Sequence, residues 1–140
     1  PMTTPNSLPK EIGWIDIDTY ADERGTLSVA DGVNGRFPFV VERVFWISDV
    51  PAGQSRGAHA HRTCAEVVVP LRGSLTACLH DGEREYRYVL DNPQRGLYIP
   101  PMVWCSFLNF STDCLCLCLT PAPYDKAGYI DAFEQFKALF

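Results

Sequence analysis

Residues 53–73 read GQSRGAHAHRTCAEVVVPLRG, and this stretch determines how the rest of the chain is interpreted. His59 and His61 stand two positions apart within it. In an extended strand, side chains at positions i and i+2 point to the same face, so both imidazoles should face one cavity. The pair therefore predicts a functional site rather than two unrelated surface residues.

Further anchor residues flank the histidine pair at defined distances. Five residues separate Gly53 from His59, four separate His61 from Glu66, and six separate Glu66 from Gly73. Glu66 has the opposite parity to the histidines, so it can reach the same cavity only if a turn or a new strand begins in the four residues before it. In spacing, the stretch resembles the first motif of the cupins. This resemblance implies a cupin double-stranded β-barrel.

Turn signals recur every eight to twelve residues, between short segments of alternating or β-branched composition. Residues 14–17 and 26–29 are expected to form a hairpin with a turn at 22–25, and residues 39–47 (FVVERVFWI) a central strand. Further short strands are expected at 66–71, 74–80, 84–90, 97–99, 104–110 and 114–119. This pattern predicts an all-β sandwich or barrel.

The two ends of the chain differ from the strand pattern. Residues 1–13 are expected to form a loose lead-in because they are rich in Pro, Thr, Ser and Asn. In residues 125–140, apolar side chains recur at steps of three and four, which predicts one amphipathic C-terminal helix. We expect residues 1–140 to form a single domain, since no linker or internal repeat interrupts them.

Composition argues against several classes of function. A net charge of −5 provides no basic patch for a nucleic-acid backbone. No apolar run approaches the roughly 20 residues of a membrane span, and residues 1–13 lack the apolar core of a signal peptide, so we expect no membrane partner and a cytoplasmic location. Cys114, Cys116 and Cys118 alternate with leucines, and in a reducing compartment we interpret them as small buried hydrophobic residues on one strand face.

One interpretation of the histidine pair is a metal site. A metal-binding cupin takes two histidines and a glutamate from its first motif and a third histidine from a second motif. The matching stretch here is residues 94–109 (QRGLYIPPMVWCSFLN), in which Cys105 stands at the position of that histidine. Because a thiolate can bind zinc or iron, His59, His61, Glu66 and Cys105 form a possible ligand set. At this point the metal alternative stays open.

The second interpretation treats the histidines as an acid and a base. Arg56 lies three residues before His59, so a cation would flank the mouth of the cavity, where a phosphate could bind. Arg24 and Arg43 are further candidates for substrate binding. Trp104 could line the same pocket or fill the core. These residues together suggest a phosphorylated substrate.

Several segments resemble the dTDP-4-keto-6-deoxyglucose 3,4-ketoisomerases, which are sugar-nucleotide cupins of deoxysugar pathways. They read DERGTL, ERVFWISDV, SRGAHAH, RGLYIPPMVW, FSTDC and PYDKAGYI. The resemblance implies an isomerase that moves the ketone of a dTDP-linked 4-keto-6-deoxyhexose from C4 to C3 through an enediol. It implies His59 as the principal base, His61 as its partner, and no cofactor, since the ketone already acidifies the adjacent C–H. It also implies a homodimer that exchanges N-terminal strands.

The chain departs from that family in the strand around Phe45 and Trp46. Family members usually carry a tyrosine there, whose phenol assists catalysis, and neither residue in this chain has a hydroxyl. Glu66 is expected to hold the tautomer of an imidazole by a hydrogen bond. Three possibilities remain: a ketoisomerase with a rearranged proton relay, a related enzyme acting on another nucleotide sugar, and a non-catalytic sugar-nucleotide-binding cupin.

Overall fold

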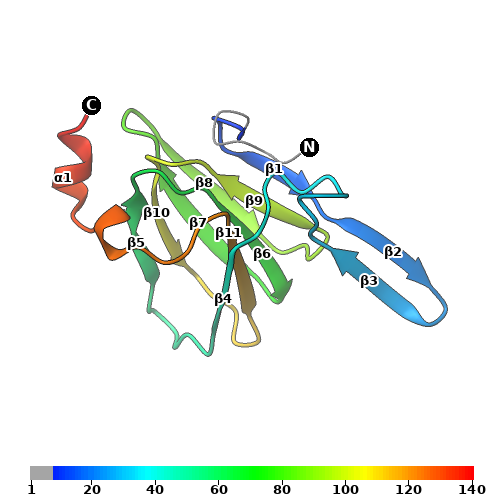
Figure 1. Cartoon of the computed structure of the whole chain (residues 1–140). Coiled ribbons are helices and arrows are strands. Elements are labelled where there is room, and N and C mark those ends of the chain that lie inside the picture. Colours follow the sequence, from blue (N-terminus) through cyan, green and yellow to red (C-terminus); the bar gives the residue numbers. More distant parts are fainter. Residues whose placement is uncertain (1–7) are drawn as a thin grey trace.

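Two five-stranded antiparallel sheets form the body of the protein (Figure 1). The computed structural model describes residues 8–140. The first sheet has the order β1 (Gly13–Asp16), β9 (Arg95–Ile99), β6 (Glu66–Arg72), β11 (Leu115–Thr120) and β4 (Arg43–Ser48). The second has the order β12 (Tyr129–Ile130), β5 (Arg56–His61), β10 (Trp104–Leu108), β7 (Leu75–His80) and β8 (Glu85–Leu90). A cupin-type all-β fold was predicted and is confirmed.

The main core lies between the two sheets. It combines Val68 and Leu97 of the first sheet with Leu79 and Phe107 of the second, all of them buried. Strand β11 shows how alternation builds this core. Cys116 and Cys118 face it, whereas Leu117 and Leu119 belong to a second apolar cluster that also contains Tyr98. Cys114 joins the main core as well, and all six cysteines are free thiols, so the prediction of small buried hydrophobic residues is confirmed for these three.

The segment before β4 covers the outer side of the first sheet. Phe37 and Phe39 are buried in the second cluster, although neither lies in a strand. A Cβ atom at Gly32 would lie within 2 Å of the Phe39 carbonyl, so only glycine permits this close approach. The predicted central strand at 39–47 was therefore wrong in two respects: its first residues pack as a loop, and β4 is an edge strand.

The N-terminal strands pair differently from the prediction. Strand β1 lies alongside β9 of the first sheet, and the hairpin consists of β2 (Asp18–Asp22) and β3 (Gly25–Val29), which pair only with each other. The predicted lead-in at 1–13 lies partly outside the described residues. Its described part is fixed rather than loose, because Leu8 packs against the second cluster and the Tyr98 hydroxyl donates to the Pro9 carbonyl at 2.8 Å.

The C-terminal segment is only partly helical. A 3₁₀ helix η2 (Lys126–Gly128) leads into β12, and the α-helix α1 covers only Phe133–Lys137. The predicted C-terminal helix is thus present but much shorter than 125–140. Tyr129 and Ile130 are extended because they pair with the edge of β5, which would otherwise expose unsatisfied backbone groups. Among the described residues, no helix is long and apolar enough to cross a membrane.

Candidate active site

Strand β5 presents both histidines to the same region. The rings of His59 and His61 lie 5.0 Å apart, centroid to centroid, in an edge-to-face arrangement. An irregularity precedes them: Gly57 and Ala58 both have positive φ, and the pairing with β10 shifts register between Cys105 and Ser106. A bulge of this kind re-aims the side chains that follow it, and such strain is often found at functional sites.

Glu66 approaches the histidines from the opposite sheet. Its Oε1 atom lies 3.5 Å from His61 Nε2, and both side chains are buried. His61 Nε2 has no hydrogen-bond partner within the described residues. A buried polar atom without a partner is costly, and the adjacent Glu66 carboxylate is placed to accept a hydrogen bond from a protonated Nε2. The structure therefore places Glu66 next to His61, but the predicted hydrogen bond between them is not formed.

Tyr129, near the C-terminal end of the described chain, contacts both histidines. It pairs with His61 across β12 and β5, and its ring centroid lies 4.5 Å from that of His61 and 4.9 Å from that of His59. Arg43 Nη1 donates a hydrogen bond to the Tyr129 hydroxyl at 3.3 Å. The structure therefore places Arg43 beside Tyr129, next to the histidine pair. Tyr129 was not predicted as a site residue because its segment was expected to be helical, although PYDKAGYI was among the family-like segments.

The surroundings lower the pKa of His59 and raise the pKa of Tyr129. Burial, followed by the charge of His61, lowers the pKa of His59 below 6.5, so its imidazole is neutral and able to accept a proton at neutral pH. Burial raises the pKa of Tyr129 above 10, although the hydrogen bond from Arg43 opposes this. The phenol therefore keeps its proton and can donate it.

Cys105 lies beside His59 in the adjacent strand and is buried. Burial and the nearby Glu66 carboxylate raise the pKa of this thiol well above 9, which disfavours the thiolate that a metal would require. Within residues 8–140, no three His, Cys, Asp or Glu side chains are arranged so that they could hold a metal ion. The proposed ligand set is therefore not preassembled.

Two predicted substrate-binding residues lie away from the histidines. Arg56 begins β5 and lines a separate open pocket of about 510 Å³ beside the loop between β4 and β5. Trp104 packs against Phe133 and Phe136 of the C-terminal segment, with ring centroids 5.5 and 5.9 Å away. Trp104 therefore fills a satellite core rather than lining the histidine site, and its neighbour Cys105 faces the main core instead.

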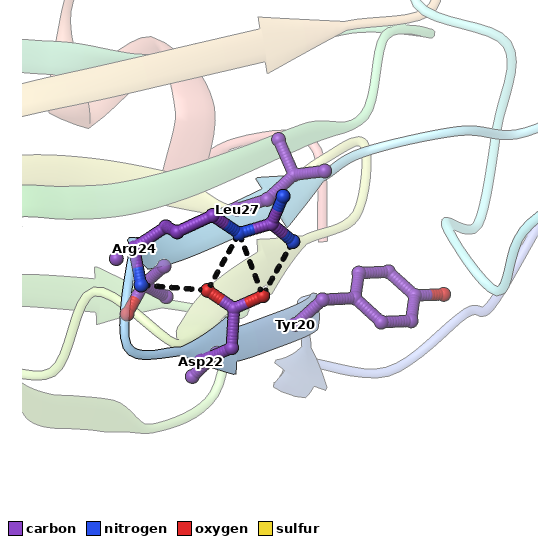
Figure 2. Close-up of a pocket in the computed structure, with 7 residues that line it drawn as sticks. Tyr20, Asp22, Arg24 and Leu27 are labelled. Carbon is purple, nitrogen blue, oxygen red and sulfur yellow. Dashed lines mark hydrogen bonds and ion pairs between the residues drawn. The ribbon is translucent and has the colours of Figure 1, made fainter.

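Arg24 lies at the tip of the β2–β3 hairpin, which projects from the sheets (Figure 1). Figure 2 shows its guanidinium paired with the Asp22 carboxylate, and the distance from Nη2 to Oδ2 is 2.6 Å. The side chain is 85% exposed. Within this chain, the structure does not bring Arg24 to the histidine pair.

Comparison with known proteins identifies relatives of the whole chain. A family model described as "FdtA: WxcM-like, C-terminal" matches residues 10–140. The TDP-4-oxo-6-deoxy-alpha-D-glucose-3,4-oxoisomerase of Aneurinibacillus thermoaerophilus is 38% identical over 123 residues, which is 88% of each chain. WlaRA, a TDP-fucose-3,4-ketoisomerase from Campylobacter jejuni, superposes with a TM-score of 0.86 at 31% identity and covers 91% of this chain and 94% of its own.

A ligand complex of a further relative is also known. QdtA, a 3,4-ketoisomerase from Thermoanaerobacterium thermosaccharolyticum, was solved as a variant in complex with TDP-4-keto-6-deoxyglucose. It has a TM-score of 0.86 and 29% identity, covering 91% of this chain and 92% of that one. All three relatives are thus described as 3,4-isomerases of keto sugars.

Proposed function

The chain belongs to the FdtA family of WxcM-like C-terminal proteins, and on this premise we propose that it is a sugar-nucleotide 3,4-ketoisomerase. Its substrate is a dTDP-4-keto-6-deoxyhexose, and its product carries the ketone at C3. The observation that carries the proposal is the pair of imidazole rings, 5.0 Å apart, facing the Glu66 carboxylate from the opposite sheet.

The proposed chemistry uses the different environments of the two histidines. His59 is neutral at cytoplasmic pH and removes the C3 proton, which the adjacent ketone makes acidic. An enediol forms, and the protonated His59 returns its proton to C4. Glu66 fixes the orientation of His61 through Nε2, and His61 in turn packs edge-to-face against His59. A second residue that holds the base in place in this way is a common feature of acid–base sites.

Arginines provide the contacts to the diphosphate in this proposal. Arg43 lies at the edge of the histidine site, and Arg56 lines the neighbouring pocket at the start of the same strand that carries the histidines. Guanidinium groups suit phosphate because they donate paired hydrogen bonds in a fixed plane. The sugar would then lie at the histidines and the nucleotide towards Arg56.

We also propose that the protein is a homodimer in which the β2–β3 hairpin docks on a second copy. The large side chains of Tyr20 and Leu27 on this hairpin are 64% and 63% exposed. No other strand of the described residues pairs with it, so it is the segment available for exchange. Docking would move Arg24 towards a partner subunit. A cytoplasmic location agrees with the six free thiols, since disulfides form mainly in oxidising compartments.

Conversion of dTDP-4-keto-6-deoxyglucose in D₂O tests the proposed function. NMR should show the ketone moving to C3 and deuterium appearing at C4, because the proton on a histidine can exchange with solvent before it is returned. Turnover should survive extensive chelation, since the ketone itself acidifies C3. Absence of any 3-keto product would contradict the proposal. Activity that is lost on chelation and restored by zinc, iron or manganese would favour the metal alternative.

A further inference from the structure

The reaction requires more than one proton transfer. When the ketone moves from C4 to C3, His59 carries a proton from C3 to C4, but the two oxygens must also exchange one. O4 begins as a carbonyl and ends as a hydroxyl, whereas O3 does the reverse. A group that first donates a proton and then accepts one, within reach of both oxygens, would complete the cycle.

Phe45 and Trp46 cannot supply this group. Phe45 has no hydroxyl, and its ring lies beneath the Arg43 guanidinium, 4.5 Å from Cζ to the ring centroid. Trp46 alternates to the other side of β4 and is 65% exposed. A hydroxyl must therefore come from another element.

Tyr129 is the phenol that the fold brings to both histidines. It is held there by the pairing of β12 with β5 and by the preceding turn, in which Asp125 caps η2 by accepting a hydrogen bond from the Ala127 N–H. Tyr124 lies nearby, with its ring 5.5 Å from that of Tyr129, but it is 60% exposed. Tyr98 lies in the second core cluster and donates its hydroxyl to the Pro9 carbonyl.

The electrostatic surroundings of Tyr129 allow it to give up and recover a proton. Arg43 donates to its hydroxyl at 3.3 Å, so a positive charge would stabilise the phenolate formed when the proton leaves. Other charged or titratable groups around it are His59, His61, Glu66 and Tyr124, and Cys64 and Asp125 line the same pocket. Burial, and to a smaller extent the Glu66 carboxylate, disfavours the phenolate, whereas Arg43 favours it. Burial prevails and raises the pKa of Tyr129, so the phenol is protonated before the reaction begins.

We propose that Tyr129 is the catalytic acid and base for the two sugar oxygens. As His59 removes the C3 proton, the Tyr129 hydroxyl protonates O4, which gives the neutral enediol, the imidazolium and the phenolate. The imidazolium then protonates C4 while the phenolate takes the proton from O3, leaving a ketone at C3. Both residues return to their starting states, and no other reactant is needed. This inference rests on the proposed ketoisomerase function.

The first test removes the hydroxyl alone. Tyr129→Phe keeps the ring that packs on both histidines, so we expect an unchanged fold and a similar KM, with kcat on dTDP-4-keto-6-deoxyglucose at least about 100-fold lower. Tyr124→Phe is the matched control, since it removes a hydroxyl from the same segment, and it should retain normal turnover. Thermal melts of both variants check folding.

The second test separates proton transfer from a structural role. Difluorotyrosine at position 129 lowers the pKa of the phenol without changing its packing greatly. The basic limb of the kcat/KM profile against pH should move to lower pH, whereas the same replacement at position 124 should leave it in place.

The outcomes of these tests are distinguishable. If the wild-type protein is active and Tyr129→Phe is equally active, the role of Tyr129 is wrong but the proposed function stands. The same holds if the basic limb of the kcat/KM profile does not move when Tyr129 is replaced by difluorotyrosine. If the wild-type protein forms no 3-keto product, the proposed function fails and the role of Tyr129 fails with it.

Discussion

The C-terminal segment and the N-terminal hairpin are both short additions to the two sheets, and they lie at opposite ends of the molecule (Figure 1). The C-terminal segment packs against the second sheet: Phe136 is fully buried, and Tyr129 contacts the histidine pair. The hairpin instead exposes Tyr20 and Leu27. The C-terminal segment thus reaches the histidines of its own chain, whereas in the proposed dimer the hairpin would dock on a second copy.

The largest expected effect comes from removing the anchor of the C-terminal segment. Phe136 packs with Ala60, Ile130 and Trp104, so Phe136→Ala leaves a cavity beneath α1. We expect the free energy of unfolding to fall by about 3 to 5 kcal/mol, measured by urea denaturation. Leu139→Ala, at a position that is 52% exposed, is the control and should have little effect. An equal effect of both changes would show that the segment is not anchored through Phe136.

A smaller effect is expected from the hairpin, and it should appear in association rather than in folding. If Leu27 is buried against a second copy, Leu27→Ser should raise the dimer dissociation constant by about 10- to 100-fold, because burying a leucine contributes roughly 1.5 to 3 kcal/mol. Sedimentation at several concentrations measures this. A wild-type protein that is monomeric at micromolar concentration would contradict the proposed role of the hairpin.

The smallest effect concerns the proton affinity of His59. Burial lowers its pKa below 6.5, so the neutral form should persist in solutions somewhat more acidic than that. Since Tyr129 covers His59, Tyr129→Ala should admit water and raise this pKa towards 6.5, whereas Leu27→Ser should not change it. NMR titration of the imidazole gives the values. A pKa of His59 above 6.5 in the wild-type protein would show that the charge of Glu66 outweighs burial.

The histidine pair and Glu66 could be predicted because pleat alternation and a strand break fix their directions regardless of the rest of the fold. Tyr129 could not, since its apolar neighbours recur at three- and four-residue steps that fit a helix equally well, and only the open edge of β5 decides otherwise. The direction of the Trp104 side chain could have been predicted from strand alternation. Because its neighbour Cys105 faces the main core, Trp104 must face the opposite side of β10. Arg24 lies on an exposed hairpin, and its role in the proposed dimer depends on a second chain, which a single sequence does not specify.

The central claim is that His59 is the base of a sugar-nucleotide 3,4-ketoisomerase, and turnover of His59→Asn on dTDP-4-keto-6-deoxyglucose tests it most directly. Asparagine keeps a polar side chain but removes the base, so nucleotide affinity should survive while kcat falls by about two orders of magnitude or more. His80→Asn is the matched control, because His80 packs against Phe133 and Phe136 rather than in the site, and it should remain active. A His59→Asn variant that turns over substrate at nearly the wild-type rate would contradict the account.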